Sequence, residues 1–111
     1  MTATDTLMVF VTTPSVEEGR TIARALVTEH LAACVNVVPG VHSVFFWEGQ
    51  LQEEAEVLLV VKTRRERYQA LQRRILELHA YSVPEVLALA VEAGSPAYLA
   101  WVGETVRAEE G

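Results

Sequence analysis

The chain has 111 residues, half of them hydrophobic, with nine basic and fifteen acidic side chains and a formal net charge of −6. This length corresponds to one domain, so we expect residues 1–111 to form a single domain. The negative charge would repel a phosphate backbone, so nucleic acid is not an expected partner. The apolar share exceeds what one small core readily buries, which favours assembly with other subunits.

Targeting signals and disulfides are not expected from this sequence. The N-terminal segment lacks a basic region, its apolar run covers only residues 7–11, and no segment reaches the ~18 apolar residues of a membrane span. Cys34 is the single cysteine and cannot form an intrachain disulfide, which fits a reducing compartment. We therefore expect a cytoplasmic protein without a membrane partner.

The first two elements in chain order are a strand and a helix. Residues 7–11 form a continuous β-prone apolar run. Ser15 with Glu18 gives a capping-box pattern, and apolar residues then recur at helical spacing as far as His30. The pattern predicts a helix from about Ser15 to Leu31.

A long β-hairpin is predicted next. Residues 34–47 are rich in β-branched residues, with a bend or bulge at Pro39-Gly40, because proline removes a donor from the ladder. Residues 48–50 are typical of a turn, and residues 56–62 predict the returning strand. At ~3.3 Å per residue the first strand would be ~46 Å long and would extend beyond its own domain. Its apolar end, residues 44–47, needs a cover, which a neighbouring subunit would provide.

The second half of the chain predicts a helix, a strand and a final helix. A second capping-box pattern begins at Thr63, and its helix should end near His79. Residues 85–91 predict the fourth strand, and Ser95-Pro96 predicts the start of a helix that ends near Val106. The order βαββαβ plus a helix indicates an α+β, ferredoxin-like sandwich with two helices on one face of an antiparallel sheet.

Six of the nine cations lie between Lys62 and Arg74. We interpret this stretch as a solvated helix surface paired with carboxylates rather than as an anion-binding patch.

Motifs from about residue 9 to residue 106 resemble the CutA divalent-cation-tolerance family. The matching positions are Phe10-Val11-Thr12 with Pro14, Leu31–Asn36 (LAACVN), Pro39-Gly40, Ser43, Trp47–Gly49 (WEG), Lys62-Thr63, His79 with Tyr81, Val83–Glu85, Tyr98-Leu99 and Trp101. The resemblance implies a homotrimer with the architecture of PII signalling proteins, tolerance of copper and other divalent cations, and metal binding in some members. Ala80 replaces the usual proline of the family's H-P-Y motif, and Gly19 replaces an alanine in the first helix.

Cys34 has three candidate roles: a packing residue, a metal ligand or a nucleophile. A nucleophile would need a base, for which His30 and His79 are the candidates. A position at a helix N-terminus would lower the pKa of the thiol, but Cys34 is the first residue of a predicted strand. No catalytic cysteine motif surrounds it. Buried free cysteine is common in protein cores, so packing is the favoured interpretation, followed by ligation.

One chain offers few metal ligands. The sequence contains no C-x-x-C, H-E-x-x-H or EF-hand pattern, and its three histidines are widely separated. In a trimer, a subunit cleft can bring Cys34 of one chain near His79 or Tyr81 of another. Cys34, His79 and Tyr81 are therefore the candidate metal-site residues, and copper or another divalent cation is the expected ligand. The alternative for His79, and for His30, is a cation at a helix C-terminus. His42 is expected to be a satisfied strand residue.

Catalysis is not expected. A ferredoxin-like acyl-phosphate hydrolase needs a cradle of backbone amides and a positioned arginine, whereas the loop after the first strand contains Pro14. With the resemblance, the sequence predicts a non-enzymatic, trimeric divalent-cation tolerance protein that binds copper or another divalent metal ion. The alternative is a rigid trimeric scaffold or PII-like regulator that binds a small ligand or a partner protein at the subunit clefts. Trp47 and Trp101 are expected to anchor subunit contacts.

Overall fold

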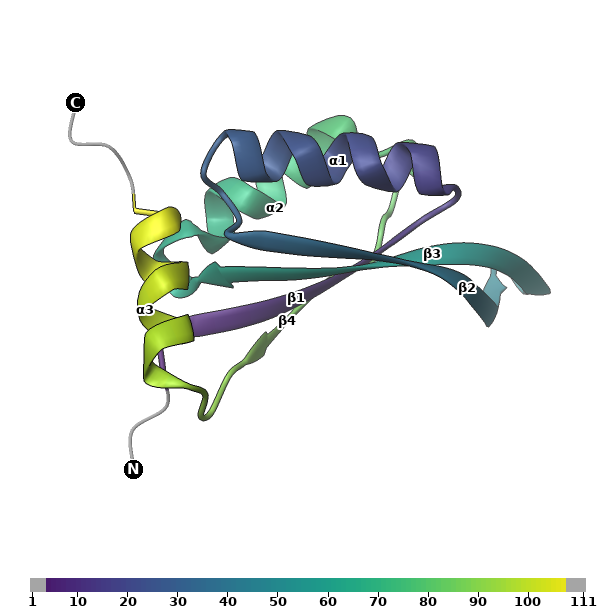
Figure 1. The fold of residues 1–111 in the computed structure, drawn as a ribbon. Coiled ribbons are helices and arrows are strands. Elements are labelled where there is room, and N and C mark those ends of the chain that lie inside the picture. Colours follow the sequence, from purple (N-terminus) through teal and green to yellow (C-terminus); the bar gives the residue numbers. More distant parts are fainter. Residues whose placement is uncertain (1–3, 108–111) are drawn as a thin grey trace.

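The computed structural model describes residues 4–107, which form a four-stranded sheet with three α-helices (Figure 1). The elements are β1 (Thr6–Thr13), α1 (Val16–Thr28), β2 (Cys34–Trp47), β3 (Gln50–Arg64), α2 (Tyr68–Leu78), β4 (Val86–Ala90) and α3 (Pro96–Thr105). The strand order is β2-β3-β1-β4, and each neighbouring pair is antiparallel. The predicted α+β, ferredoxin-like arrangement is confirmed.

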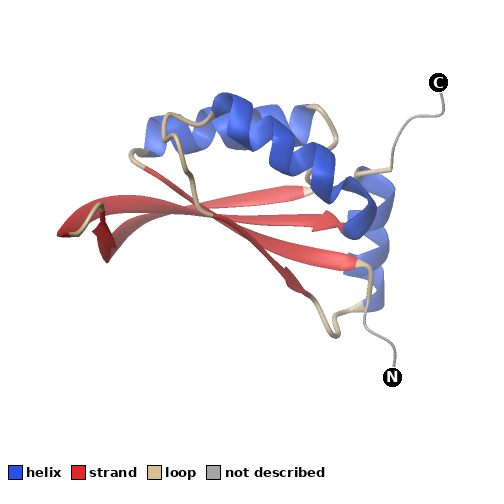
Figure 2. Ribbon diagram, turned by 180° about the vertical axis from the view of Figure 1, so that it is seen from behind, coloured by secondary structure: helices blue, strands red, loops and turns tan. Residues whose placement is uncertain are grey.

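The core lies between one face of the sheet and the two helices α1 and α2, while α3 stands across one end of the strands (Figures 1 and 2). Alternate residues of each central strand point into this core. The fully buried core side chains are Val9, Val11, Ile22, Leu26, Leu59, Val61, Leu71 and Ile75. The residues between them point to the opposite face of the sheet.

The hairpin formed by β2 and β3 projects beyond α1 (Figure 1). The register shifts between Val38 and Val41, which confirms the predicted irregularity at Pro39-Gly40, where Gly40 has a φ of 87°. Glu48 and Gly49 connect the strands with φ values of 52° and 78°, as a type I′ turn requires. The molecule is 44 Å long along its principal axis.

Three predicted boundaries are corrected. β3 begins at Gln50 rather than Glu56, because Gln50 pairs with Trp47 and the ladder continues to the turn. α1 ends at Thr28 rather than Leu31, because His30 adopts the left-handed conformation with a φ of 59°. Thr63 does not cap a helix: it remains in β3 and donates its buried hydroxyl to the Leu31 carbonyl at 2.7 Å. A 3₁₀ turn at Arg65–Arg67 therefore precedes α2.

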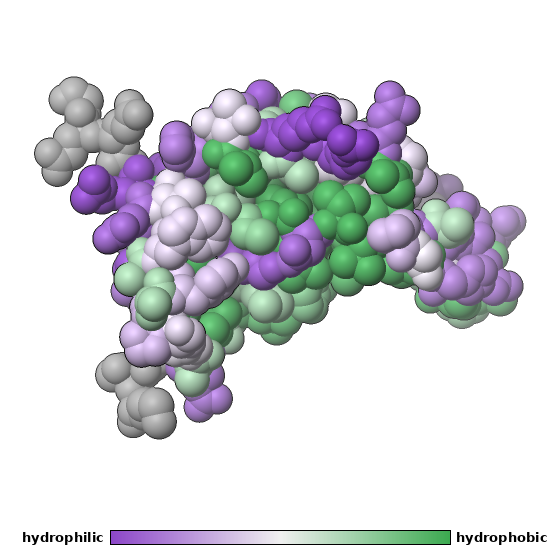
Figure 3. Space-filling model, in the orientation of Figure 1, coloured by the Kyte–Doolittle hydropathy of each residue, from purple (hydrophilic) through white to green (hydrophobic). Residues whose placement is uncertain are grey.

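Large apolar side chains remain exposed on the strands. At the hairpin tip, Phe46 is 74% exposed and Trp47 is 46% exposed. Leu87 and Leu89 of β4 are exposed on the face opposite to α1 and α2, next to Phe10 and Met8 of β1. Apolar residues form a continuous area over the strands below the polar surface of α1 (Figure 3). Such an area marks an interaction surface.

No helix within residues 4–107 combines the length and the apolar character that crossing a membrane requires.

Candidate functional site

Cys34 is the first residue of β2 and pairs with Lys62 of β3. Val35 and Val37 pack against the core, so Cys34 and Asn36 lie on the opposite face of the strand. The Lys62 ammonium donates a hydrogen bond to the Asn36 side-chain oxygen. Cys34 is half-buried rather than enclosed in the core.

The last helix carries a tyrosine, Tyr98, whose pKa is raised. Burial raises the pKa of Tyr98, and the charge of a Cys34 thiolate would raise the pKa of this phenol further. The Tyr98 and Trp101 rings are 5.5 Å apart on α3. The neighbours of Cys34 within the sheet come from β2 and β3.

His79 follows the last residue of α2 and is only 8% exposed. Its Nε2 donates to the Thr12 carbonyl at 2.7 Å, because a carbonyl can only accept. Its Nδ1 accepts the backbone N–H of Tyr81 at 3.0 Å. With one nitrogen donating and the other accepting, the ring is a neutral imidazole. The charged helix-terminal role considered for His79 is therefore wrong.

Tyr81 extends this arrangement to β3. Its hydroxyl donates to Glu56 Oε2 at 3.0 Å, and its ring lies 4.7 Å from the His79 ring. Burial is the main reason why the pKa of Tyr81 rises to about 12. The hydrogen bond to Glu56 raises this pKa further, and so do the negative charges of Glu56, Glu54 and Glu18. Glu56 is itself 8% exposed, so Tyr81 is the donor that satisfies a buried carboxylate.

Glu18 lies at the start of α1 near this group. Its backbone N–H donates to the Ser15 side chain at 3.1 Å, which confirms half of the predicted capping box. Its Oε2 is buried and has no hydrogen-bond partner among residues 4–107. The sequence pattern assigned Glu18 to the cap and Glu56 to the start of a strand, so neither carboxylate was recognised as a neighbour of Tyr81.

The three predicted metal ligands are not brought together within one chain. His79 and Tyr81 are in contact, but His79 bonds Thr12, whereas Cys34 is aligned through Lys62 with Met8. Met8 and Thr12 are four residues apart on β1, about 13 Å at ~3.3 Å per residue. Within residues 4–107, no three His, Cys, Asp or Glu side chains are arranged to hold a metal ion. Any site that contains all three residues needs a second subunit.

The other candidate bases and cations have partners of their own. His30 donates its Nδ1–H to the Thr105 carbonyl at 3.0 Å, and His42 pairs with Glu53 at 2.9 Å on the exposed hairpin. Arg64 pairs with Asp5 and Glu66, and Arg74 pairs with Glu29 and Glu77. These pairs confirm the interpretation of His42, and they fit the predicted paired helix surface.

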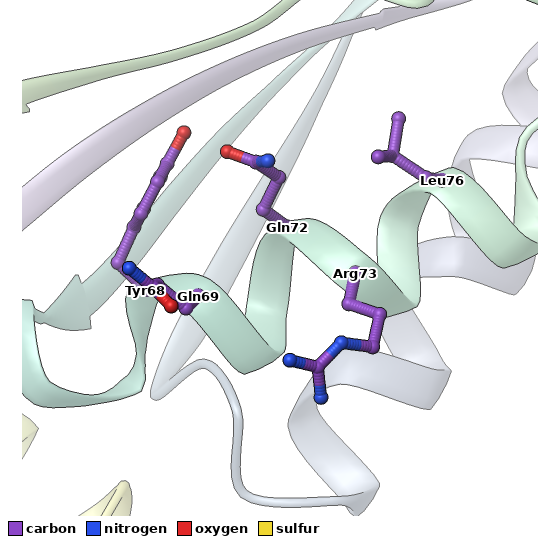
Figure 4. A pocket seen from close by; sticks show the side chains of 5 residues that line it. All are labelled: Tyr68, Gln69, Gln72, Arg73 and Leu76. Carbon is purple, nitrogen blue, oxygen red and sulfur yellow. The ribbon is translucent and has the colours of Figure 1, made fainter.

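A groove of about 460 Å³ runs along the outer side of α2 (Figure 4). Tyr68, Gln72 and Leu76 project from the same side of the helix, and Gln69 and Arg73 complete the lining. It contains none of the candidate ligands, so it lies outside the candidate site.

A family model described as CutA1 divalent ion tolerance protein matches residues 7–105. The divalent-cation tolerance protein CutA of Thermus thermophilus is 48% identical over 97 residues, which cover 87% of this chain and 94% of that protein. The chloroplastic protein CutA 1 of Oryza sativa is 43% identical over 96% of this chain, and the match spans only 60% of that longer protein.

Solved structures give the same result. The Cut A1 divalent cation tolerance protein of Thermus thermophilus superposes with a TM-score of 0.90 at 46% identity, covering 92% of this chain and 99% of that one. CutA1 of Oryza sativa superposes with a TM-score of 0.91 at 42% identity, covering 98% of this chain and 100% of that one.

Proposed function

Because this chain belongs to the CutA1 divalent ion tolerance family, we propose that it is a non-enzymatic tolerance protein that binds copper or another divalent cation within a homotrimer. The observation that carries the proposal is the half-buried Cys34 thiol on the sheet face away from α1 and α2. A thiol in this position can be shared with a neighbouring subunit, whereas a core thiol could not. We place the protein in the cytoplasm, because its single cysteine suits a reducing compartment.

The trimer is supported by the exposed apolar strands. The hairpin tip with Phe46 and Trp47 projects beyond the helices, and Leu87 and Leu89 are exposed on the helix-free face. A tip that packs on the neighbouring subunit's sheet forms a head-to-tail contact, and such contacts close into rings. Three copies is the number that the family architecture implies.

The metal chemistry follows from the donor atoms. A thiolate is a soft ligand that favours Cu(I), and Cu(II) could instead oxidise it. Cys34 is therefore the first ligand of the proposed site. His79 and Tyr81 of a neighbouring subunit are the candidate further ligands, but each would have to exchange a present hydrogen bond for the metal.

The test is an anaerobic competition titration with Cu(I) on wild type and on Cys34→Ser, His79→Ala and His42→Ala, each first confirmed as a trimer. Loss of the thiolate should weaken binding by about 100-fold or more, beyond the usual effect of an outer-shell change. His42→Ala is the control, because His42 pairs with Glu53 on the exposed hairpin, and it should bind as wild type does. Equal affinity and stoichiometry in Cys34→Ser would remove Cys34 from the site.

A second candidate function is a rigid trimeric scaffold or PII-like regulator that binds a small ligand or partner protein at the subunit clefts. It is favoured by His79 and Tyr81, whose polar side-chain atoms already have partners within the chain. The same titration distinguishes the two functions, since a scaffold would bind Cu(I) equally weakly in all four proteins.

A further inference from the structure

The groove on the outer side of α2, here called the α2 groove, has dimensions that suit a short peptide (Figure 4). Its volume of about 460 Å³ is within the ~300–1,000 Å³ of ordinary binding sites. It extends along the helix from Tyr68 to Leu76, which is about 12 Å at ~1.5 Å per residue. This length matches about four residues of an extended chain at ~3.3 Å each.

One side of the α2 groove offers an apolar contact. Tyr68 packs against the main core, so its ring is held in place, and Leu76 at the other end is 48% exposed. Both side chains point to the same side of the helix, with Gln72 between them (Figure 4). A large apolar side chain of a partner can therefore pack between an exposed leucine and a fixed aromatic ring.

The other side of the α2 groove is positively charged. Arg73 is the one charged residue in the lining, is exposed, and forms no ion pair within residues 4–107. Glu77, on the next turn, is already paired with Arg74 at 3.4 Å. Arg65, which precedes the groove, is also exposed and has no ion pair in the described part of the chain. A carboxylate of a partner would therefore find an arginine that no neighbouring acid occupies.

This positive charge is local to the helical layer. The chain as a whole has a formal net charge of −6, and residues 34–61, which include most of the hairpin, contain no lysine or arginine. Because charge complementarity steers partners to their binding surface, an acidic partner would be directed towards α2 and repelled by the hairpin.

We propose that the α2 groove is a docking surface for an acidic segment of a partner protein that carries a large apolar side chain. The apolar side chain packs on Leu76 and Tyr68, and a carboxylate of the segment pairs with Arg73. The lining includes neither Cys34 nor His79, so docking needs no metal and goes beyond the proposed metal site.

The test is the fluorescence anisotropy of a fluorescein-labelled peptide, in which glutamates surround a pair of leucines, titrated with the metal-free protein in its native assembly. We expect a Kd below about 100 μM. Arg73→Glu should weaken binding about tenfold or more, because it replaces an attractive charge with a repulsive one. Arg20→Glu is the matched control, since Arg20 is exposed on α1, outside the groove. The same change of net charge there should weaken binding by less than about twofold.

The apolar contact is tested by a second pair of variants. Leu76→Ala should weaken binding about fivefold, because the peptide then buries less apolar surface. Val27→Ala shortens an exposed apolar side chain of α1 and should bind the peptide as wild type does.

Three results would overturn the docking surface. The first is no binding by wild type, which is also expected if a neighbouring subunit covers the α2 groove. The second is an equal loss of affinity in Arg73→Glu and Arg20→Glu. The third is unchanged binding in Leu76→Ala, which would indicate a general attraction of anions, nucleic acid included. None of these measurements involves Cu(I), so a failed metal titration leaves the docking surface standing, and the reverse also holds.

Discussion

His79 shows how a single residue can be fixed by contacts that are distant in sequence. Its ring joins the end of α2 to Thr12 of β1 and to the backbone of Tyr81, and it is almost fully buried. The sequence pattern placed it at a helix end but gave no sign of these partners. Its neutral state therefore follows from tertiary structure, not from local sequence.

His79→Ala should lower the free energy of unfolding by about 2–4 kcal/mol, because it leaves the Thr12 carbonyl and the Tyr81 N–H without their partners and opens a cavity. Urea unfolding measures the change. His42→Ala, which removes a histidine from the exposed hairpin, should change stability by less than about 1 kcal/mol. Equal effects of the two substitutions would contradict the assigned role of His79.

Tyr81 gives a pH dependence whose direction is set by its raised pKa. The folded pKa of about 12 exceeds the ordinary value of 10.0, so the phenol's contribution to stability is complete below pH 10. It is lost as the pH rises towards 12. The stability difference between wild type and Tyr81→Phe should therefore be constant from pH 7 to about 9 and shrink above pH 10. Unfolding midpoints across this range measure it, and a constant difference up to pH 12 would exclude the contact with Glu56.

At the scale of the elements, the order of strands and helices was predictable because apolar spacing records which face is buried. The first half of β3 could not be predicted from apolar spacing, because residues 50–56 are mostly polar and exposed. Their strand conformation depends on pairing with β2. The end of β3 was also missed, since Thr63 carries a capping pattern but uses its hydroxyl to bond Leu31. Tertiary pairing decided both boundaries.

The backbone conformation of the hairpin turn can be tested by substitution. Glu48 has a φ of 52°, a conformation that asparagine adopts more readily than glutamate. Glu48→Asn should therefore stabilise the protein by up to about 1 kcal/mol, as seen in thermal unfolding. Gly49→Ala, at a φ of 78°, should destabilise it by about 1 kcal/mol or more. A destabilised Glu48→Asn variant would mean that the turn has another conformation.

At the scale of the whole molecule, the exposed apolar strands mark an interaction surface, and the proposed trimer would cover them. Trp47 is 46% exposed in the single chain and lies at the projecting tip. If it anchors a subunit contact, Trp47→Ala should weaken assembly by about 3–5 kcal/mol while the core of each chain stays folded. Sedimentation equilibrium measures the change, with hydrogen exchange of β1 as the control. An assembly as stable as that of wild type would show that Trp47 has a different role.

Native mass spectrometry of the protein loaded anaerobically with Cu(I) tests the central claim most directly, because one spectrum reports both subunit number and bound copper. We predict a species of three times 12.3 kDa that carries copper, and a Cys34→Ser trimer of the same size without it. A monomer, or a Cys34→Ser trimer that retains the full copper content, would contradict the proposed shared thiolate site.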